Sequence, residues 1–193
     1  MILITTSRRP TKRIRSFIKD LAKSIPNAVR RNRGKASTED LCIEALARGL
    51  SRVLIVERWR GNPGIMRFIL VGPRLCEHLK TAFVLKGVTL SREIGLRNRR
   101  KTEKRELILA VPHNAGKDST DLCEELAFCL GEHIEVDRID IAGKPSGYEE
   151  YSVLTLTAWS QGWKFTFYDG ETWEEVGPRF TIRGVWKIGE AQS

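Results

Sequence analysis

The sequence predicts an α/β fold of the α+β type, built from two similar halves. Three observations support this prediction. Apolar runs with the alternation of strands flank segments whose apolar residues recur at helical spacing. The pattern of the first half returns in the second half. The chain has 193 residues, 41% of them hydrophobic, which is enough to bury a sizeable core.

The repeat is visible as a constant offset between apolar positions. Residues 2–4 return as residues 107–109, an offset of 105 positions. The next segment keeps this offset, because Phe17, Ile18, Leu21, Ala22 and Ile25 are matched by Leu122, Cys123, Leu126, Ala127 and Leu130. Further on the offset is 100, and Val53, Leu54 and Trp59 are matched by Val153, Leu154 and Trp159. Each half is therefore predicted to run strand, helix, strand, hairpin.

Two helices are predicted in the first half. The first has Pro10 in its opening turn and one apolar face formed by Ile14, Phe17, Ile18, Leu21 and Ile25. The second spans residues 37–49, with Ser37 as N-cap, Asp40 at the third helical position and Gly49 near the C-cap. This second helix has no clear counterpart later in the chain.

Strands complete each half. Residues 27–32 are predicted as a strand, and residues 52–60 and 65–71 as a hairpin about the turn Gly61-Asn62-Pro63-Gly64. A second hairpin joins residues 151–160 to 163–168 about Gln161-Gly162, and residues 180–188 form a last strand. The polar, basic residues 97–105 are predicted to link a first half, residues 1–96, to a second half, residues 106–193.

The cysteines indicate neither a metal site nor a need for a disulfide. Cys42, Cys76, Cys123 and Cys129 are scattered and lack zinc-ligand spacing, so all four are expected to be small buried residues in a reducing compartment. No apolar stretch approaches the roughly 20 residues of a membrane span. We expect a cytoplasmic protein.

The charge is distributed unevenly along the chain. Residues 1–100 contain 23 Lys and Arg against 7 Asp and Glu, a net charge of +16, whereas residues 101–193 carry a net charge of −7. Clustered cations are what binding to a polyanion requires, since neutralising phosphates releases counterions. A solvated basic surface without a ligand is the alternative.

Candidate RNA-binding residues follow from this distribution. Lys12, Arg15, Lys19 and Lys23 lie on one side of the first predicted helix, opposite its apolar face. The equivalent side of the repeated helix carries Asp121, Glu124 and Glu125, so the scaffold does not need the cations. Arg8 and Arg9 precede the helix beside hydroxyl residues, an arrangement that suits a phosphate. The full predicted set is Arg8, Arg9, Lys12, Arg13, Arg15, Lys19, Lys23, Arg30, Arg31, Arg33 and Lys35, with Arg97, Arg99, Arg100 and Lys101 in the linker.

Three segments resemble the Brix domain of ribosome biogenesis factors. The first is Thr5-Thr6-Ser7-Arg8-Arg9-Pro10-Thr11-Lys12-Arg13, followed by Phe17 and Lys19-Asp20-Leu21. The second comprises Arg60-Gly61-Asn62-Pro63 and Gly72-Pro73-Arg74, and the third is Glu175-Val176-Gly177-Pro178-Arg179-Phe180-Thr181. The resemblance covers nearly the whole chain, as a single domain of compact archaeal type. It implies a role in pre-rRNA processing or subunit assembly, and a duplicated fold whose halves resemble the anticodon-binding domain of class II aminoacyl-tRNA synthetases.

Other functions are less well supported by the sequence. His78, His113 and His133 stand beside no known nucleophile pattern, and the chain lacks the phosphate-binding loops GxxxxGK[ST] and GxGxxG. No cofactor, catalytic residue or small-molecule substrate is therefore predicted. The expected partners are rRNA or pre-rRNA, with other assembly proteins. A protein–protein scaffold with only non-specific nucleic-acid affinity stays open as an alternative, as do a DNA-binding protein and, less favoured, a metal-dependent nuclease.

Overall fold

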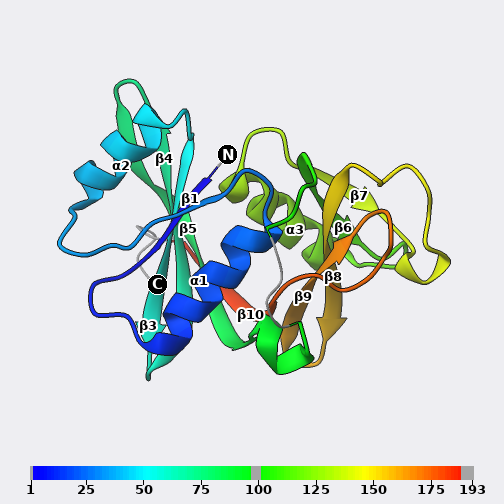
Figure 1. The fold of residues 1–193 in the computed structure, drawn as a ribbon. Coiled ribbons are helices and arrows are strands. Elements are labelled where there is room, and N and C mark those ends of the chain that lie inside the picture. The colour runs from blue at the N-terminus through cyan, green and yellow to red at the C-terminus, as the bar shows by residue number, and fades with distance from the viewer. Residues whose placement is uncertain (1, 97–100, 188–193) are drawn as a thin grey trace.

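The computed structural model describes residues 2–96 and 101–187 (Figure 1). Within these ranges the α-helices are α1 (Lys12–Ser24), α2 (Thr38–Ala47) and α3 (Lys117–Leu130). The strands of the first half are β1 (Ile2–Thr6), β2 (Val29–Arg30), β3 (Arg52–Trp59), β4 (Asn62–Gly72) and β5 (Leu75–Thr89). Those of the second half are β6 (Glu106–Val111), β7 (Glu135–Arg138), β8 (Tyr151–Trp159), β9 (Gly162–Asp169) and β10 (Arg179–Lys187). Two short 3-10 helices are η1 (Ser91–Ile94) and η2 (Ile141–Gly143). The fold is of the α+β type.

All of these strands belong to one mixed sheet of ten strands, in the order β2-β1-β3-β4-β5-β10-β9-β8-β6-β7. β1 runs parallel to β2 and β3, and β6 runs parallel to β7 and β8. The remaining neighbours are antiparallel, including β5 and β10, which join the two halves. The second half therefore repeats the order of strand pairings of the first.

The pairing register follows the offsets seen in the sequence. Leu3 of β1 pairs with Val53 of β3. Ile108, 105 positions after Leu3, pairs with Val153, which is 100 positions after Val53. The edge strands β2 and β7 depart from the offset of 105 by one position. Leu3 pairs with Val29 of β2, whereas Ile108 pairs with Glu135 of β7, which is 106 positions after Val29.

The main hydrophobic core lies on one face of the sheet and is shared by both halves. Helices α1 and α3 cover this face at the centre of the molecule, and α2 lies on the outside of the first half (Figure 1). Phe17 of α1 contacts Phe180 of β10 with ring centroids 6.2 Å apart, so the first helix packs on the last strand. Two smaller cores fill the opposite face, one under α2 and one around Trp173. Burial of this apolar surface is the main source of stability.

Most predicted elements are confirmed, with shifted ends. The second helix begins after Ser37, which forms a capping box with Asp40, as predicted. Pro10 precedes the first helix instead of lying in its first turn, because Thr11 is the N-cap. The predicted strand at residues 27–32 shrinks to β2, and the hairpin turn falls on Arg60 and Gly61, which have positive φ, rather than on the four residues from Gly61 to Gly64.

β5 was not predicted. Its first residues, 75–78, are exposed at the edge of a long hairpin, whereas residues 81–85 are buried in succession. The strand therefore lacks the single alternating pattern from which strands are recognised in a sequence. It nevertheless provides the partner of β10, so the missed strand is the one that joins the halves.

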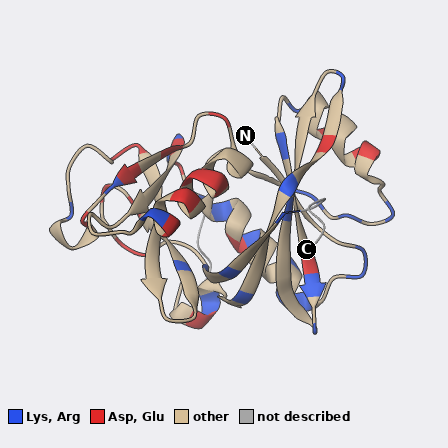
Figure 2. Cartoon of the chain, turned by 180° about the vertical axis from the view of Figure 1, so that it is seen from behind, with Lys and Arg blue, Asp and Glu red and all other residues tan. Residues whose placement is uncertain are grey.

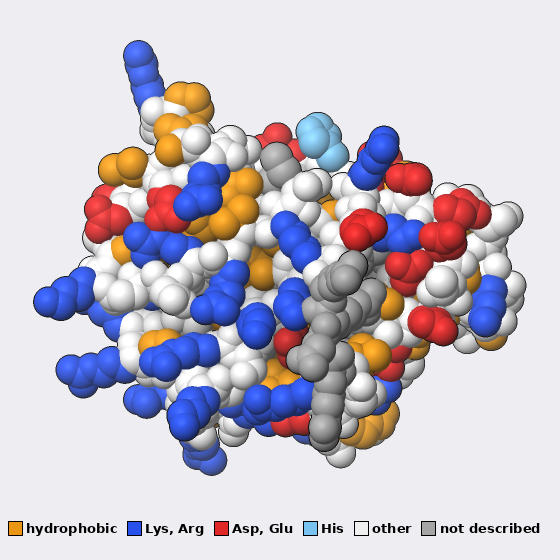
Figure 3. Space-filling view, viewed as in Figure 1, with side chains coloured by type: hydrophobic (Ala, Val, Ile, Leu, Met, Phe, Trp, Pro, Cys, Tyr) orange, Lys and Arg blue, Asp and Glu red, His pale blue; other side chains and the backbone are white. Residues whose placement is uncertain are grey.

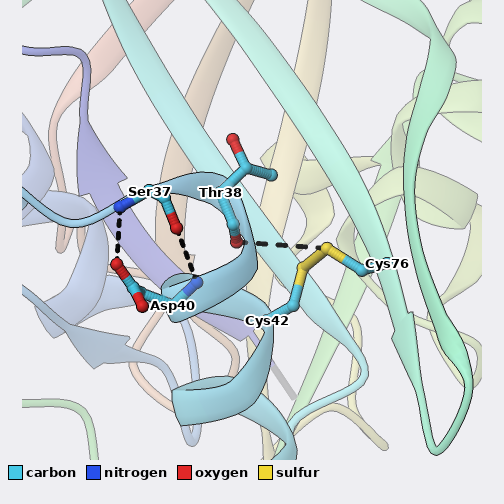
Figure 4. The surroundings of a disulfide bond; sticks show 5 residues. All are labelled: Ser37, Thr38, Asp40, Cys42 and Cys76. Carbon is cyan, nitrogen blue, oxygen red and sulfur yellow. Dashed lines mark hydrogen bonds between the residues drawn. A yellow bond between two sulfur atoms is a disulfide. The ribbon is translucent and has the colours of Figure 1, made fainter.

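The expectation that all four cysteines are unpaired and buried is wrong for two of them. Cys42 of α2 and Cys76 of β5 form a disulfide bond (Figure 4), and Cys76 is exposed. Packing of α2 on the outer face brings the two residues together across a sequence separation of 34, which no sequence pattern indicates. Cys123 and Cys129 are free and buried, as expected, and burial raises the pKa of each thiol to about 12.

Reduction of this disulfide is expected to lower the free energy of unfolding by about 3–4 kcal/mol, because the bond closes a loop of 34 residues in the unfolded chain. Denaturant unfolding with and without reductant measures the change. The double variant Cys42→Ser/Cys76→Ser should match the reduced protein and be insensitive to reductant. Equal stability of the oxidised and reduced proteins would contradict this prediction.

Candidate nucleic-acid interface

A cationic hollow lies beside the start of α1. It has a volume of about 480 Å³ and is lined by Thr6, Ser7, Arg8, Arg9, Pro10, Arg15, Ile18, Arg30, Asn32, Arg33 and Gly34. Five of these residues are arginines, and none carries a carboxylate. We call this site the arginine hollow. It combines guanidinium groups with hydroxyl and amide groups, which are ligands suited to phosphate.

Three chain segments build the arginine hollow. Arg8 and Arg9 lie in the loop between β1 and α1, where the Ser7 N–H donates to the Val56 carbonyl at 3.0 Å and Arg9 adopts a φ of +59°. Arg15 comes from the first turn of α1. Arg30 ends β2, and Arg33 follows it in the next loop. Parallel pairing of β1 with β2 brings these loops together at one end of the sheet.

Arg33 of the hollow is repelled by neighbouring arginines. Burial lowers the pKa of Arg33, and the nearby charges of Arg8 and Arg31 lower it further, whereas Glu39 and Glu57 act in the opposite direction. Arg33 is held in place by donating from Nε to the Ala36 carbonyl at 3.0 Å, and Arg30 donates to the side chain of Asn32 at 2.8 Å. A bound anion would relieve this repulsion, whereas a second cation would increase it.

Arg13 and Arg31, both predicted to bind RNA, form ion pairs with glutamates of this chain. Arg13 donates to both carboxylate oxygens of Glu93, at 2.5 and 2.9 Å, and to the Val88 carbonyl at 2.7 Å. This hydrogen bonding lowers the pKa of Glu93 and joins α1 to η1. Arg31 pairs with Glu44 of α2. Helical geometry alone did not reveal these partners, which come from distant segments.

The four cations predicted on the outer side of α1, Lys12, Arg15, Lys19 and Lys23, do not line a single hollow. Arg15 lines the arginine hollow, whereas Lys19 and Lys23 line a second hollow of about 580 Å³ that also contains Asp20 and Glu93. Lys12 and Lys35 are exposed near the start of α1 and after β2. The second hollow is therefore mixed in charge, and the purely cationic site lies at the other end of α1.

The linker candidates are only partly placed. Arg97, Arg99 and Arg100 fall outside the described residues. Lys101 donates to the Ala28 carbonyl at 2.9 Å, which fixes the end of the linker against the first half.

The described surface is divided by charge. Lys and Arg side chains gather over the first half and most Asp and Glu side chains over the second half (Figure 3), and the ribbon coloured by residue type shows the same division (Figure 2). In the second half, Arg138 at the end of β7 donates to the His113 carbonyl at 2.9 Å and to the Thr120 hydroxyl at 3.3 Å, closing the loop before α3. The outward Asp121 pairs with Lys117. The repeated helix thus keeps the buried face of α1 without its cationic surroundings.

The third Brix-like segment is structural. Gly177 is buried so tightly that a Cβ there would lie 2.5 Å from Ser24 Oγ and 2.8 Å from Phe167 Cβ. The Ser24 hydroxyl donates to the Val176 carbonyl at 3.3 Å, and Arg179 binds Glu175 through two hydrogen bonds. This segment therefore fastens the end of α1 to β9.

Among residues 2–96 and 101–187, no group of three or more His, Cys, Asp and Glu side chains is placed to hold a metal ion. None of the described helices has the length and apolar character needed to cross a membrane.

The curated proteins that this chain resembles are named as ribosomal biogenesis proteins. A probable Brix domain-containing ribosomal biogenesis protein from Pyrococcus abyssi is 42% identical over 190 residues, covering 96% of this chain and 84% of that protein. The corresponding protein from Aeropyrum pernix is 52% identical over 91 residues. Shorter matches cover 63% and 50% of the relatives from Thermococcus kodakarensis and A. pernix. No protein-family model matches the chain.

Solved structures show the same fold. The crystal structure of a probable ribosomal biogenesis protein from Aeropyrum pernix K1 matches with a TM-score of 0.75 and 34% identity, covering 98% of this chain and 97% of that one. An archaeal Imp4-like protein, Mil, matches with a TM-score of 0.65 at 22% identity, a likeness of fold alone. The chain belongs to the family of Brix domain-containing ribosomal biogenesis proteins.

Gly177→Ala is expected to destabilise the protein by about 1–3 kcal/mol, because the added methyl group must displace Ser24 or Phe167 from a packed core. Gly184→Ala is the matched control, since a Cβ at Gly184 meets no atom within 4 Å. Thermal and denaturant unfolding of both variants measure the difference. Equal effects of the two substitutions would contradict the structural role of this segment.

Proposed function

We propose that this protein is a non-catalytic RNA-binding factor of ribosome assembly, and that the arginine hollow holds phosphate groups of rRNA or pre-rRNA. The observation that carries the proposal is the convergence of five arginines, without a carboxylate, on one hollow. Phosphate contacts supply most of the affinity of non-specific RNA binding and position the protein for any specific contacts. The names of its relatives, ribosomal biogenesis proteins, support the same role.

A protein–protein scaffold is the second candidate, and the acidic surface of the second half favours it. Figure 2 shows acidic residues along the ribbon of the second half, including α3, and a basic partner protein would find complementary charge there. The two roles are compatible, because they use opposite halves. A metal-dependent nuclease has less support, since the described acids do not gather into a metal site. The names of the relatives above do not indicate catalysis.

We also infer that the chain arose by internal duplication and forms a single domain with halves 1–96 and 106–193. The repeated order of strand pairings and the shared register of β1 with β3 and β6 with β8 support this inference. Resemblance of each half to the anticodon-binding domain of class II aminoacyl-tRNA synthetases stays a prediction, as does the cytoplasmic location.

Replacing Arg8, Arg9 and Arg15 together with Gln is expected to lower RNA affinity by roughly tenfold or more. If each arginine neutralises one phosphate, the plot of log affinity against log salt becomes shallower by roughly 2–3 units on a duplex and about 2 units on a single strand. Stability should change little, since exposed charges usually alter it by under about 0.5 kcal/mol each. Binding isotherms at several salt concentrations and a thermal melt measure both effects.

The matched control removes the same charge elsewhere. Lys144, Lys164 and Arg183 lie in the second half, and their triple Gln variant should bind RNA almost as tightly as the unchanged protein. Glu124→Gln tests the acidic side and should not weaken RNA binding, whereas Asp121 and Glu125 are left intact because they pair with Lys117 and Lys187. If the two triple variants lose affinity equally, the arginine hollow is not the site, and residues 97–105 become the leading candidate.

The duplication makes a separate geometric prediction. Residues 2–71 should superpose on residues 107–170 through strand, helix, strand and hairpin, with the α2 segment as the inserted element. The measurement is the backbone deviation over the paired strands and over α1 against α3. Unrelated paths of the two chains between their strands would contradict a common origin of the halves.

A further inference from the structure

An exposed tryptophan lies at the tip of the β3–β4 hairpin. Trp59 is 49% exposed and pairs with Asn62 across a two-residue turn. Both turn residues are left-handed, with φ of +47° at Arg60 and +84° at Gly61. A Cβ at Gly64 would lie 2.1 Å from the Cβ of Trp59, so only glycine lets the tryptophan pack against this strand. The indole is therefore carried by a strand residue beside a two-residue turn and not by a longer loop.

The hairpin tip is fastened to the start of α1. The hydroxyl of Thr11, the N-cap of α1, donates to the Gly61 carbonyl at 2.9 Å. Thr11 directly follows the loop that carries Arg8 and Arg9. Figure 1 shows the tip of β3 and β4 next to the beginning of α1. Trp59 thus belongs to the same end of the molecule as the arginine hollow.

The chain segments that meet at this hairpin tip are rich in cations. Arg58 and Arg60 flank it in the chain, and both are exposed, as is Lys12 beside Thr11. The nearest acid in the sequence, Glu57, is paired with Arg67 at 3.0 Å. An exposed aromatic ring among cations suits a ligand with flat rings and negative charge.

We propose that Trp59 is a stacking platform for a base of single-stranded RNA whose phosphates extend toward the arginine hollow. This inference rests on the proposed function and specifies its substrate class. Unpaired bases expose their faces to an aromatic side chain, whereas the bases of a duplex are stacked on one another. The platform therefore makes the protein prefer unpaired segments of rRNA over helical ones.

The second half provides an internal control. Trp159, 100 positions later, occupies the tip of the β8–β9 hairpin and is 57% exposed. Its chain neighbours are Ala158 and Ser160 in place of arginines. The ammonium group of Lys86 lies over its ring, 5.2 Å from the centroid. This cation–π contact occupies one ring face of Trp159, whereas no cation–π contact is found at Trp59 among the described residues.

The test compares the unchanged protein with Trp59→Ala, Trp59→Phe and Trp159→Ala. Each is titrated with a short single-stranded RNA, with the same strand in a duplex, and with the strand carrying one abasic position. Trp59→Ala should weaken single-strand binding about five- to hundredfold, the range of stacking by one base, and leave duplex binding unchanged. The salt slope should stay the same, because stacking releases no counterions. Trp59→Phe should retain most of the affinity, and Trp159→Ala all of it.

Each other outcome has a definite meaning. If Trp59→Ala binds single strands normally while the Arg8/Arg9/Arg15 variant is impaired, stacking is excluded and the proposed function stands. If Trp59→Ala and Trp59→Phe weaken single-strand and duplex binding alike and lower the melting temperature, Trp59 is a structural residue. Equal losses for Trp59→Ala and Trp159→Ala would also overturn the platform. If the unchanged protein binds no form of RNA, the proposed function and this inference fail together.

Discussion

The antiparallel pairing of β5 with β10 is the contact on which the rest of the structure depends. It turns two five-stranded halves into one sheet, and the core on its inner face is consequently continuous. Each central helix then ends against the other half. The Ser152 hydroxyl of β8 donates to the Ser24 carbonyl at the end of α1, at 2.8 Å. Arg52 of β3, 1% exposed, donates to the Phe128 carbonyl near the end of α3, at 3.4 Å.

Arg52 and Ser152 occupy equivalent positions, 100 residues apart. Each donates to a backbone carbonyl near the end of a helix of the other half, Arg52 from its guanidinium and Ser152 from its hydroxyl. A buried guanidinium is tolerated only with partners, and Arg52 has the Ser51 carbonyl at 3.0 Å, Glu132 at 3.3 Å and the Phe128 ring at 5.5 Å. The Ser152 hydroxyl needs a single acceptor. Because the end of each central helix bonds to the other half, neither half holds all of its hydrogen-bond partners on its own. The two halves share one sheet and one main core.

Helical periodicity and turn residues were sufficient to predict those elements that depend on residues close together in the sequence. The buried face of α1, the capping box at Ser37 and both hairpins follow from periodicity and turn residues, and their observed bounds lie close to the predicted ones. The disulfide and the pairing of Arg13 with Glu93 join segments 34 and 80 residues apart, so no local pattern contains them. The predicted cations were of the right type, but only tertiary contacts separate those occupied by carboxylates from those lining the arginine hollow. The exposure of Trp59 could not be predicted, because alternation in a hairpin does not show which end of the strand lies outside the core.

The likeness of the two halves in strand order shows which positions leave room for charge to be concentrated in one of them. Packing constrains only the inner faces of α1 and α3, and these keep the same apolar spacing in both halves. The outer faces and the loops at the strand ends are free to change. In the second half Arg138 donates hydrogen bonds to the His113 carbonyl and the Thr120 hydroxyl, so an arginine of the same half closes the loop before α3. In the first half Arg8, Arg9 and Arg15 face a hollow with no carboxylate among its lining residues. The same arrangement of strands thus holds a loop closed by its own arginine in one half and a hollow lined by arginines without a carboxylate in the other, and such a hollow favours an anionic partner.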